Sequence, residues 1–168
     1  MNKKRIADYG IQIGCMKKGK LNKITDVPGV RVGHATLCDE HRHTGVTVIL
    51  PCEDNMFAKK LTAASFVLNG FGKTQGLVQI DELGTLETPI ALTNTLNVGL
   101  VHDALVSVMA ERCKADRVPM YSINPVVGEC NDAQLNDIVD RPVREEHVRA
   151  AIESACADFD EGDVGAGA

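Results

Sequence analysis

Residues 30–50 read VRVGHATLCDEHRHTGVTVIL, a stretch whose hydrophobic pattern predicts two strands joined by a polar loop. Val30–His34 alternates apolar and polar residues with the period of two that a half-buried strand needs, and Gly45–Leu50 repeats the pattern with β-branched residues. The polar residues from Cys38 to Thr44 lie between them. Because Asp26–Gly29 (DVPG) is a turn signal just before the first strand, we expect a β-hairpin to begin there.

Helices and strands alternate in the rest of the chain. In chain order, the residues predict a short helix at 76–83, a strand at 88–95, a helix at 98–113, a strand at 122–127 and a helix that starts at Pro142. Residues 57–68 fit a strand and a helix equally well and stay unassigned. This order of elements predicts an α/β or α+β sandwich in which helices pack on a sheet, and we assign it to the α+β class as a single domain over residues 1–168.

The composition limits the classes of protein that this chain can belong to. With 44% apolar and 24% charged residues, 168 residues are enough for one domain with a core. The net charge of -5 argues against a nucleic-acid partner, which calls for a concentrated basic face. No run of about 18 apolar residues is present, and no secretory signal follows the basic residues at the start, so we expect a cytoplasmic protein without membrane association.

The six cysteines form no Cys-x-x-Cys pair and are expected to be free, mostly buried thiols.

Two kinds of catalytic centre find no support in the residues. The densest group of possible metal ligands is His34, Cys38, His41 and His43, but their spacing matches no standard zinc pattern, and the loop around them is an ordinary polar turn. We therefore expect no metal site. The serines lie in no Gly-x-Ser-x-Gly motif, so we expect no catalytic nucleophile within this chain.

Polar residues crowd the ends of two predicted strands, at 93–97 (TNTLN) and 129–132 (ECND). Carboxamides and a carboxylate at the end of an apolar strand are typical of a binding pocket at a sheet edge, where Glu129 could pair with a cationic group such as an amine. Turn-forming Asn and Asp residues explain the same composition without a ligand. The residues alone leave both interpretations open.

A series of collinear blocks resembles the L-aminopeptidase/D-esterase family, which includes β-peptidyl aminopeptidases. The resemblance covers nearly the whole chain and is more specific than any single short motif. The blocks are Asn22–His34, Thr44–Pro51, Asn69–Gly72, Glu82–Gly84, Leu86–Thr95, Val126–Glu129, Leu135–Ile138 and Gly162–Gly167.

The resemblance implies a fold and an activity. Members are αββα sandwiches similar to N-terminal-nucleophile hydrolases: one precursor cuts itself, and a serine becomes the new N-terminus of a second chain, where its free amine can act as the base. They release N-terminal L-, D- or β-amino acids from peptides, amides and esters, without a metal or organic cofactor, and are usually homo-oligomers. By the same resemblance, Glu129 matches the acid that holds the free amine of the substrate, and Asn94 and Asn136 match positions beside the pocket.

The chain departs from the family at its glycine-rich block, residues 162–168. In the family this block continues into many more residues, which include the nucleophilic serine. We therefore expect the N-terminal portion of the α-chain of such an enzyme, an incomplete sandwich that needs the missing C-terminal portion or β-chain as its partner and is inactive alone. Two alternatives remain open at this point: an acyltransferase of the ornithine acetyltransferase type, and a non-catalytic binding protein.

Overall fold

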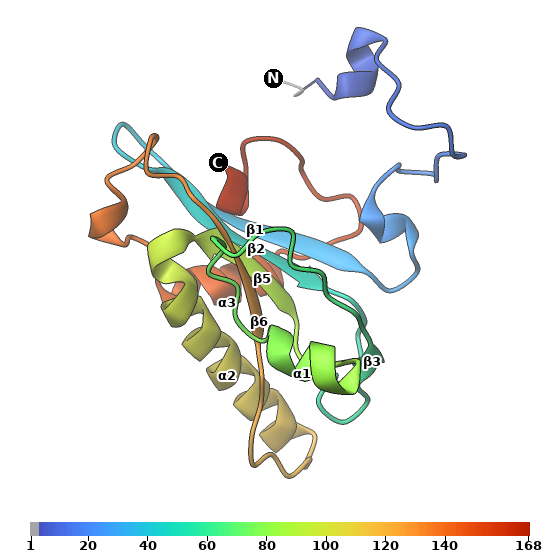
Figure 1. The fold of residues 1–168 in the computed structure, drawn as a ribbon, viewed down its shortest axis with the longest axis vertical. Coiled ribbons are helices and arrows are strands. Elements are labelled where there is room, and N and C mark those ends of the chain that lie inside the picture. The colour runs from blue at the N-terminus through green and yellow to red at the C-terminus, as the bar shows by residue number, and fades with distance from the viewer. Residues whose placement is uncertain (1–3) are drawn as a thin grey trace.

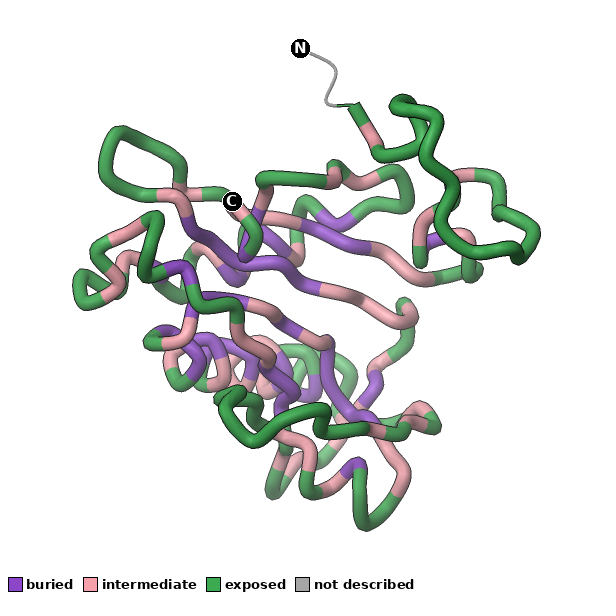
Figure 2. Tube along the Cα trace, turned by 45° about the horizontal axis from the view of Figure 1, so that its top comes forward, coloured by how far each residue is buried: buried purple, intermediate pink, exposed green. Residues whose placement is uncertain are grey.

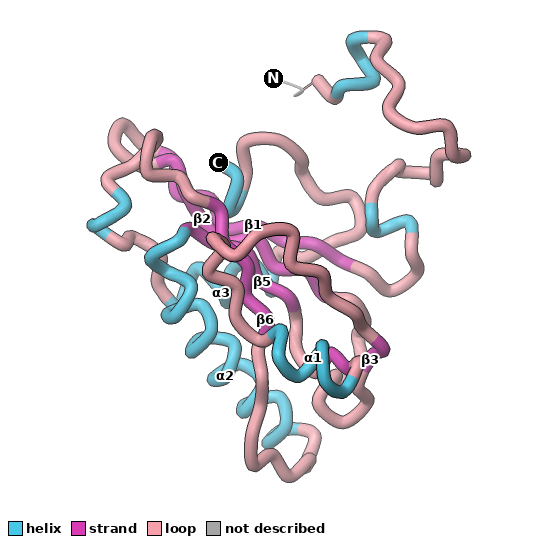
Figure 3. The backbone as a smooth tube through the Cα atoms, in the orientation of Figure 1, coloured by secondary structure: helices cyan, strands magenta, loops and turns pink. Residues whose placement is uncertain are grey.

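A mixed four-stranded sheet forms the centre of the computed structural model, which describes residues 4–168 (Figures 1 and 3). Its strands are Arg31–Cys38 (β1), His43–Leu50 (β2), Ile90–Asn94 (β5) and Val126–Cys130 (β6), in the order β1-β2-β5-β6. β1 and β2 form the predicted antiparallel hairpin, β2 pairs antiparallel with β5, and β5 pairs parallel with β6. A second sheet of two strands pairs Leu61–Thr62 (β3) with Thr85–Leu86 (β4).

Within residues 4–168, three α-helices accompany the sheets: Leu77–Leu83 (α1), Val98–Ala115 (α2) and Glu145–Glu153 (α3). α2 provides the crossover that the parallel pair β5 and β6 requires. Together α2 and α3 form one layer on one face of the four-stranded sheet (Figure 1). Short 3-10 turns complete the fold at Ile6–Tyr9, Ile24–Asp26, Thr95–Asn97, Ile138–Asp140 and Gly165–Gly167. None of the helices in residues 4–168 is both long enough and apolar enough to span a membrane.

The main core lies between this helical layer and the sheet, where buried residues are concentrated (Figure 2). It includes Val46 and Val48 from β2, Val127 from β6, Val101 and Leu105 from α2, and Val148 from α3. Each buried side chain of this size contributes about 1.5–3 kcal/mol relative to its exposed form. A smaller cluster of Met56, Ile80, Leu86 and Val126 packs α1 against β4 and the start of β6.

Gly33 sets the distance between β1 and α3. A Cβ atom added at Gly33 would lie 1.9 Å from the carbonyl oxygen of Ala151 and 2.7 Å from the amide nitrogen of Ala155. Both of these are backbone atoms, so they cannot move away as the tip of a side chain could. The helix therefore packs this closely because residue 33 has no side chain.

Several predicted elements are confirmed. The hairpin, α2 and the short helix α1 occur where the sequence predicts them, and Gly84 ends α1 in the left-handed conformation with φ 63°. The strand predicted from Ser122, however, begins only at Val126. Its start was wrong because the amide of Asn124 donates to the Glu87 carboxylate at 2.8 Å and Pro125 has no N–H to donate to a neighbouring strand.

Two other expectations were wrong in detail. The last helix starts at Glu145 rather than at Pro142, since Arg144 adopts an extended conformation with φ -133° and ψ 167°, which places the N-cap there. The cysteines are mostly not buried: within the described residues only Cys113 is buried, and four of the six are exposed. Their wide scatter over loops and strand ends explains this exposure.

The ion pair between the buried carboxylate of Glu87 and the exposed Lys60 gives the fold a testable dependence on pH. Glu87 is 3% exposed, and its carboxylate accepts from Lys60 Nζ at 2.6 Å and from the Asn124 amide at 2.8 Å. Burial alone would raise the pKa of Glu87, but hydrogen bonds from Lys60, Gln79 and Asn124 outweigh it and lower the pKa below its usual value. The ionised form therefore stabilises the fold above the unfolded-state pKa, and this contribution is lost as the pH falls through the lowered pKa.

We expect Glu87→Gln to lower the free energy of unfolding by about 1–2 kcal/mol at neutral pH, because the amide replaces two charge-assisted hydrogen bonds with weaker ones. Urea unfolding of both proteins at about pH 7 and about pH 3.5 tests this, and the difference should shrink at the lower pH. A difference that stays constant with pH would show that the Glu87 charge does not stabilise the fold.

Candidate functional site

The carboxyl ends of β5 and β6 lie side by side because the two strands are parallel. Their register pairs Thr93 with Glu129 and Asn94 with Cys130. After β5 the chain continues into the turn Thr95–Asn97, and after β6 it enters the loop that contains Asp132. The two polar stretches that the sequence singles out therefore meet at one edge of the sheet.

Glu129 is the half-buried carboxylate at this edge. The hydroxyl of Thr95, just after the neighbouring strand, donates a hydrogen bond to the carboxylate and fixes its orientation. Burial raises the pKa of the adjacent Cys130 thiol, and the negative charges of Glu129 and Asp132 raise it further. The edge therefore carries negative potential and favours a cationic group over an anionic one.

Asn94 is 1% exposed and connects three elements below this edge. Its Nδ2 donates to the hydroxyl of Thr44 at 3.0 Å, and its Oδ1 accepts from the amide of Asn97 at 3.1 Å. These bonds join the start of β2, the end of β5 and the first turn before α2. Its amide thus supports the shape of the edge, and direct binding of a substrate by Asn94 stays a prediction.

Asn136 ties the loop after β6 to the start of β2. Its Nδ2 donates to the carbonyl of His43 at 2.6 Å, and its Oδ1 accepts from the His43 amide. It also donates to the carbonyl of Asp132 at 3.2 Å, within its own loop. Contact between Asn136 and a substrate likewise stays a prediction. His43 and Thr44 could not be recognised as partners from the sequence, because they lie 93 residues from Asn136 and 50 residues from Asn94.

Asp132 adds a second carboxylate at this edge. It is 7% exposed, and within residues 4–168 neither of its carboxylate oxygens has a hydrogen-bond partner. Asn97 Oδ1, at the end of the turn after β5, has none in this part of the chain either. Buried acceptors of this kind call for a donor or a cation. The chemistry of the edge is thus that of a site for a positively charged, hydrogen-bond-donating group.

The group of possible metal ligands in the hairpin is separated by the fold. Cys38 Sγ lies 3.4 Å from His43 Nδ1, whereas His34 is bonded to Thr47 and His41 lies at the exposed tip of the loop. Among residues 4–168, no group of three or more His, Cys, Asp or Glu side chains could hold a metal ion. The fold therefore does not bring the four side chains together.

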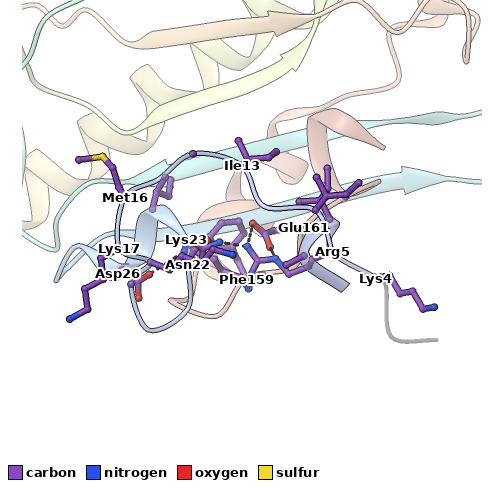
Figure 4. A pocket seen from close by; sticks show the side chains of 18 of the residues that line it. Lys4, Arg5, Ile13, Met16, Lys17, Asn22, Lys23, Asp26, Phe159 and Glu161 are labelled. Carbon is purple, nitrogen blue, oxygen red and sulfur yellow. Dashed lines mark hydrogen bonds and ion pairs between the residues drawn. The ribbon is translucent and has the colours of Figure 1, made fainter. Parts of the chain in front are cut away.

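Two hollows lie away from this edge. One, of about 1210 Å³, is formed between the N-terminal residues and the segment at 159–163, where Arg5 pairs with Glu161 (Figure 4). The other, of about 710 Å³, lies between the hairpin loop and the residues that lead into α3. Glu129 lines neither hollow. We locate the site by the chemistry of the strand ends, since neither hollow brings these polar groups together.

Comparison with protein families decides the class of the chain. The model of peptidase family S58 matches residues 22–168. The chain belongs to peptidase family S58. This result favours the peptidase over the acyltransferase alternative. It also supports the resemblance drawn from the sequence blocks.

Two curated relatives of the chain are named as β-peptidyl aminopeptidases. The chain is 36% identical over 159 residues to the β-peptidyl aminopeptidase BapA of Sphingosinicella xenopeptidilytica, and 35% identical over 173 residues to that of Sphingosinicella microcystinivorans. These matches cover 89% and 97% of this chain but 39% and 42% of the relatives. The chain thus spans less than half the length of the curated relatives that it matches.

Solved structures of similar proteins share the fold. The PH0078 protein of Pyrococcus horikoshii OT3 superposes with a TM-score of 0.90 at 49% identity, and a β-aminopeptidase of Burkholderia sp. with 0.90 at 45%. The L-aminopeptidase D-Ala-esterase/amidase of Ochrobactrum anthropi, described as a variant of the Ntn hydrolase fold, gives 0.86 at 33%. Each match covers 96–98% of this chain and 47–48% of the other. The predicted fold class is confirmed: the chain has the mixed helix-and-sheet fold of these neighbours.

Proposed function

We propose that this S58 chain is the amine-binding part of a self-processing serine aminopeptidase that releases N-terminal L-, D- or β-amino acids from peptides, amides and esters. The observation that carries the proposal is Glu129, a half-buried carboxylate held by Thr95 at a negatively charged sheet edge. A carboxylate in this setting binds a substrate ammonium through charge-assisted hydrogen bonds. Because Glu129 would bind only a free amine, cleavage would be restricted to the N-terminal residue of the substrate.

Asn94 and Asn136 complete the proposed site by fixing the two backbone segments on either side of Glu129. Asn94 fixes the turn that carries Thr95, and Asn136 fixes the loop after Glu129 against the start of β2. Neither amide is ionisable, so the charge at the edge stays with the carboxylates. This arrangement preorganises Glu129, which lowers the entropy lost when an ammonium binds.

The catalytic nucleophile, by this proposal, comes from the polypeptide that supplies the rest of the relatives' length, as a C-terminal portion or as a separate β-chain. There a serine hydroxyl would attack the scissile carbonyl, with a free α-amine taking its proton. Assembly with that part, and association of several copies, are the partners that we expect. A peptide, amide or ester with a free amine is the expected substrate.

We expect the 168-residue chain alone to show no hydrolysis of β-alanyl, L-alanyl or D-alanyl p-nitroanilide, because a covalent route needs a nucleophile that it lacks. Release of nitroaniline at 405 nm measures this directly, with the enzyme purified from the source organism as the positive control. Intact mass of that enzyme should reveal a co-purifying polypeptide that begins with Ser or Thr. Turnover by the chain alone would contradict the proposed division of the active site, and a single species near 18.1 kDa without partner would favour a binding protein.

A further inference from the structure

One of the free thiols has an imidazole base directly beside it. Cys38 is the last residue of β1 and His43 is the first residue of β2, and the register of the hairpin pairs the two residues directly. Side chains of directly paired residues lie on the same face of a sheet. Cys38 Sγ accordingly lies 3.4 Å from His43 Nδ1, within hydrogen-bonding distance for sulfur.

The hairpin loop holds these two residues close together. The amide of Asp39 donates to the carbonyl of Arg42 at 2.9 Å. The carboxylate of Asp39 accepts from the amides of His41 and Arg42, each at 2.9 Å, and from Arg42 Nε at 2.7 Å. Because this closed turn joins Cys38 to His43, it limits how far the ends of the two strands can separate.

The backbone of His43 is held from the other side by Asn136. Asn136 Nδ2 donates to the carbonyl of His43 at 2.6 Å, and Asn136 Oδ1 accepts from the His43 amide. The imidazole therefore extends from a fixed backbone toward the thiol. A nucleophile within hydrogen-bonding distance of a base, with the base held by a third group, is the arrangement that activates a nucleophilic side chain.

The hydrogen bonds allow His43 to act as this base. Within residues 4–168, its Nε2 makes no hydrogen bond, whereas Nδ1 faces the thiol of Cys38. Sulfur is a weak acceptor, so the favoured arrangement is a neutral ring protonated at Nε2, whose Nδ1 accepts from the S–H group. Once the proton has moved to Nδ1, the imidazolium donates to the thiolate, which is the nucleophilic form of cysteine.

The charges next to Cys38 do not oppose a thiolate. The adjacent carboxylate, Asp39, pairs with the guanidinium of Arg42, and this hydrogen bond lowers the pKa of Asp39 to about 2. The negative charge is thus matched by a positive one. At Cys130, by contrast, burial raises the pKa of the thiol, and the charges of Glu129 and Asp132 raise it further.

Within residues 4–168, none of the other five thiols has a base at hydrogen-bonding distance. Cys113 is buried, and the sulfur of Cys52 lies 3.9 Å from a backbone carbonyl oxygen, which only accepts. Cys15 and Cys156 are exposed, as Cys38 is, but their thiols make no hydrogen bond in this part of the chain. We call Cys15 and Cys156 the reference thiols, because they combine exposure to solvent with the absence of an activating group.

We propose that Cys38 and His43 form a thiol-modification site, at which hydrogen peroxide oxidises the Cys38 thiol to a sulfenic acid. The sulfur attacks one oxygen of the peroxide, and the O–O bond breaks as the S–O bond forms. Sulfur loses two electrons, and the peroxide is reduced. His43 takes up the thiol proton and delivers it to the departing hydroxide, which leaves as water. The exposed position of Cys38 gives a small oxidant access to the sulfur.

Alkylation of the 168-residue chain by iodoacetamide at about pH 7 measures how nucleophilic each thiol is. The sulfur replaces iodide on this neutral reagent, and mass spectrometry of the peptides gives a separate rate for each cysteine. We expect Cys38 to react about tenfold faster than the reference thiols, because the rate follows the thiolate fraction. After limiting hydrogen peroxide, dimedone, which labels sulfenic acids, should label Cys38 first. Equal rates for Cys38 and the reference thiols would overturn the proposal.

His43→Gln tests the role of the base, and His41→Gln is its matched control. Glutamine at position 43 keeps the backbone groups that Asn136 binds but cannot take up a proton, so the rate of Cys38 should fall to that of the reference thiols. His41 is exposed in the same loop, and its ring makes no hydrogen bond to Cys38. His41→Gln should therefore leave the rate of Cys38 unchanged.

The buried Cys113 reports whether each variant is folded, because it stays unlabelled in a folded chain. If Cys113 becomes labelled in His43→Gln, this variant has unfolded, and the comparison of Cys38 with the reference thiols in the unchanged chain decides. A folded His43→Gln chain in which Cys38 reacts as fast as in the unchanged chain would refute the role of His43.

Discussion

Replacement of Gly33 by alanine is expected to lower the free energy of unfolding by about 3 kcal/mol or more, the largest loss of stability that we expect from adding a single methyl group. The new Cβ atom would lie 1.9 Å from the Ala151 carbonyl oxygen, well inside contact distance. α3 would have to move away from β1, which separates Val148 from the strand residues beneath it. Interiors are close-packed, so this shift would cost contacts along the whole helix.

Urea unfolding followed by circular dichroism measures the effect, and Gly99→Ala is the matched control. Gly99 is in α2, is exposed, and has nothing within 4 Å of an added Cβ atom. Alanine there should stabilise the chain by about 0.5 kcal/mol through helix propensity and a less flexible unfolded state. If both variants changed stability alike, the close packing of α3 on β1 would be wrong.

The local elements could be predicted because their side chains repeat with a clear period. Val46, Thr47 and Val48 alternate between the two faces of β2, and the apolar stripe of α2 includes Leu105, which is fully buried. Patterns of this kind indicate which face of a helix or strand is buried, and this burial determines how each element packs. The start of β6 could not be predicted in the same way, since it depends on the bond between the Asn124 amide and Glu87, 37 residues away.

The site was predictable in part. The sequence placed Glu129 and Asn94 at strand ends, and the parallel pairing of β5 and β6 brings them to one edge. The bonds of Asn136 to His43 had no local signal, because only the tertiary fold brings the two residues together. The position of Gly165 and Ala166 could not be predicted for a different reason: residues 162–168 have no side-chain pattern, and the two backbone amides are held by the hydroxyls of Thr36 and Thr47.

Glu129→Gln is expected to weaken the binding of a free amine about tenfold or more, because an ammonium loses its charged acceptor while the shape of the side chain is kept. The Thr95 hydroxyl can still donate to the amide oxygen of glutamine, so the edge should keep its structure. Glu82→Gln is the control. Glu82 is an exposed carboxylate on α1, and its replacement removes the same charge at a position far from the site in the sequence. It should bind the amine like the unchanged chain.

Binding of β-alaninamide to the 168-residue chain, followed by NMR chemical shifts of the amides of Glu129 and Cys130, tests the central claim most directly. We expect shifts that follow a one-site binding curve with a Kd of about 10 mM or weaker, because a single partly exposed ion pair binds weakly without the rest of the enzyme. N-acetyl-β-alaninamide, which lacks the positive charge, should cause no such shifts, and Glu129→Gln should abolish them. Equal shifts with the acetylated compound, or unchanged binding in Glu129→Gln, would show that Glu129 does not recognise the substrate amine.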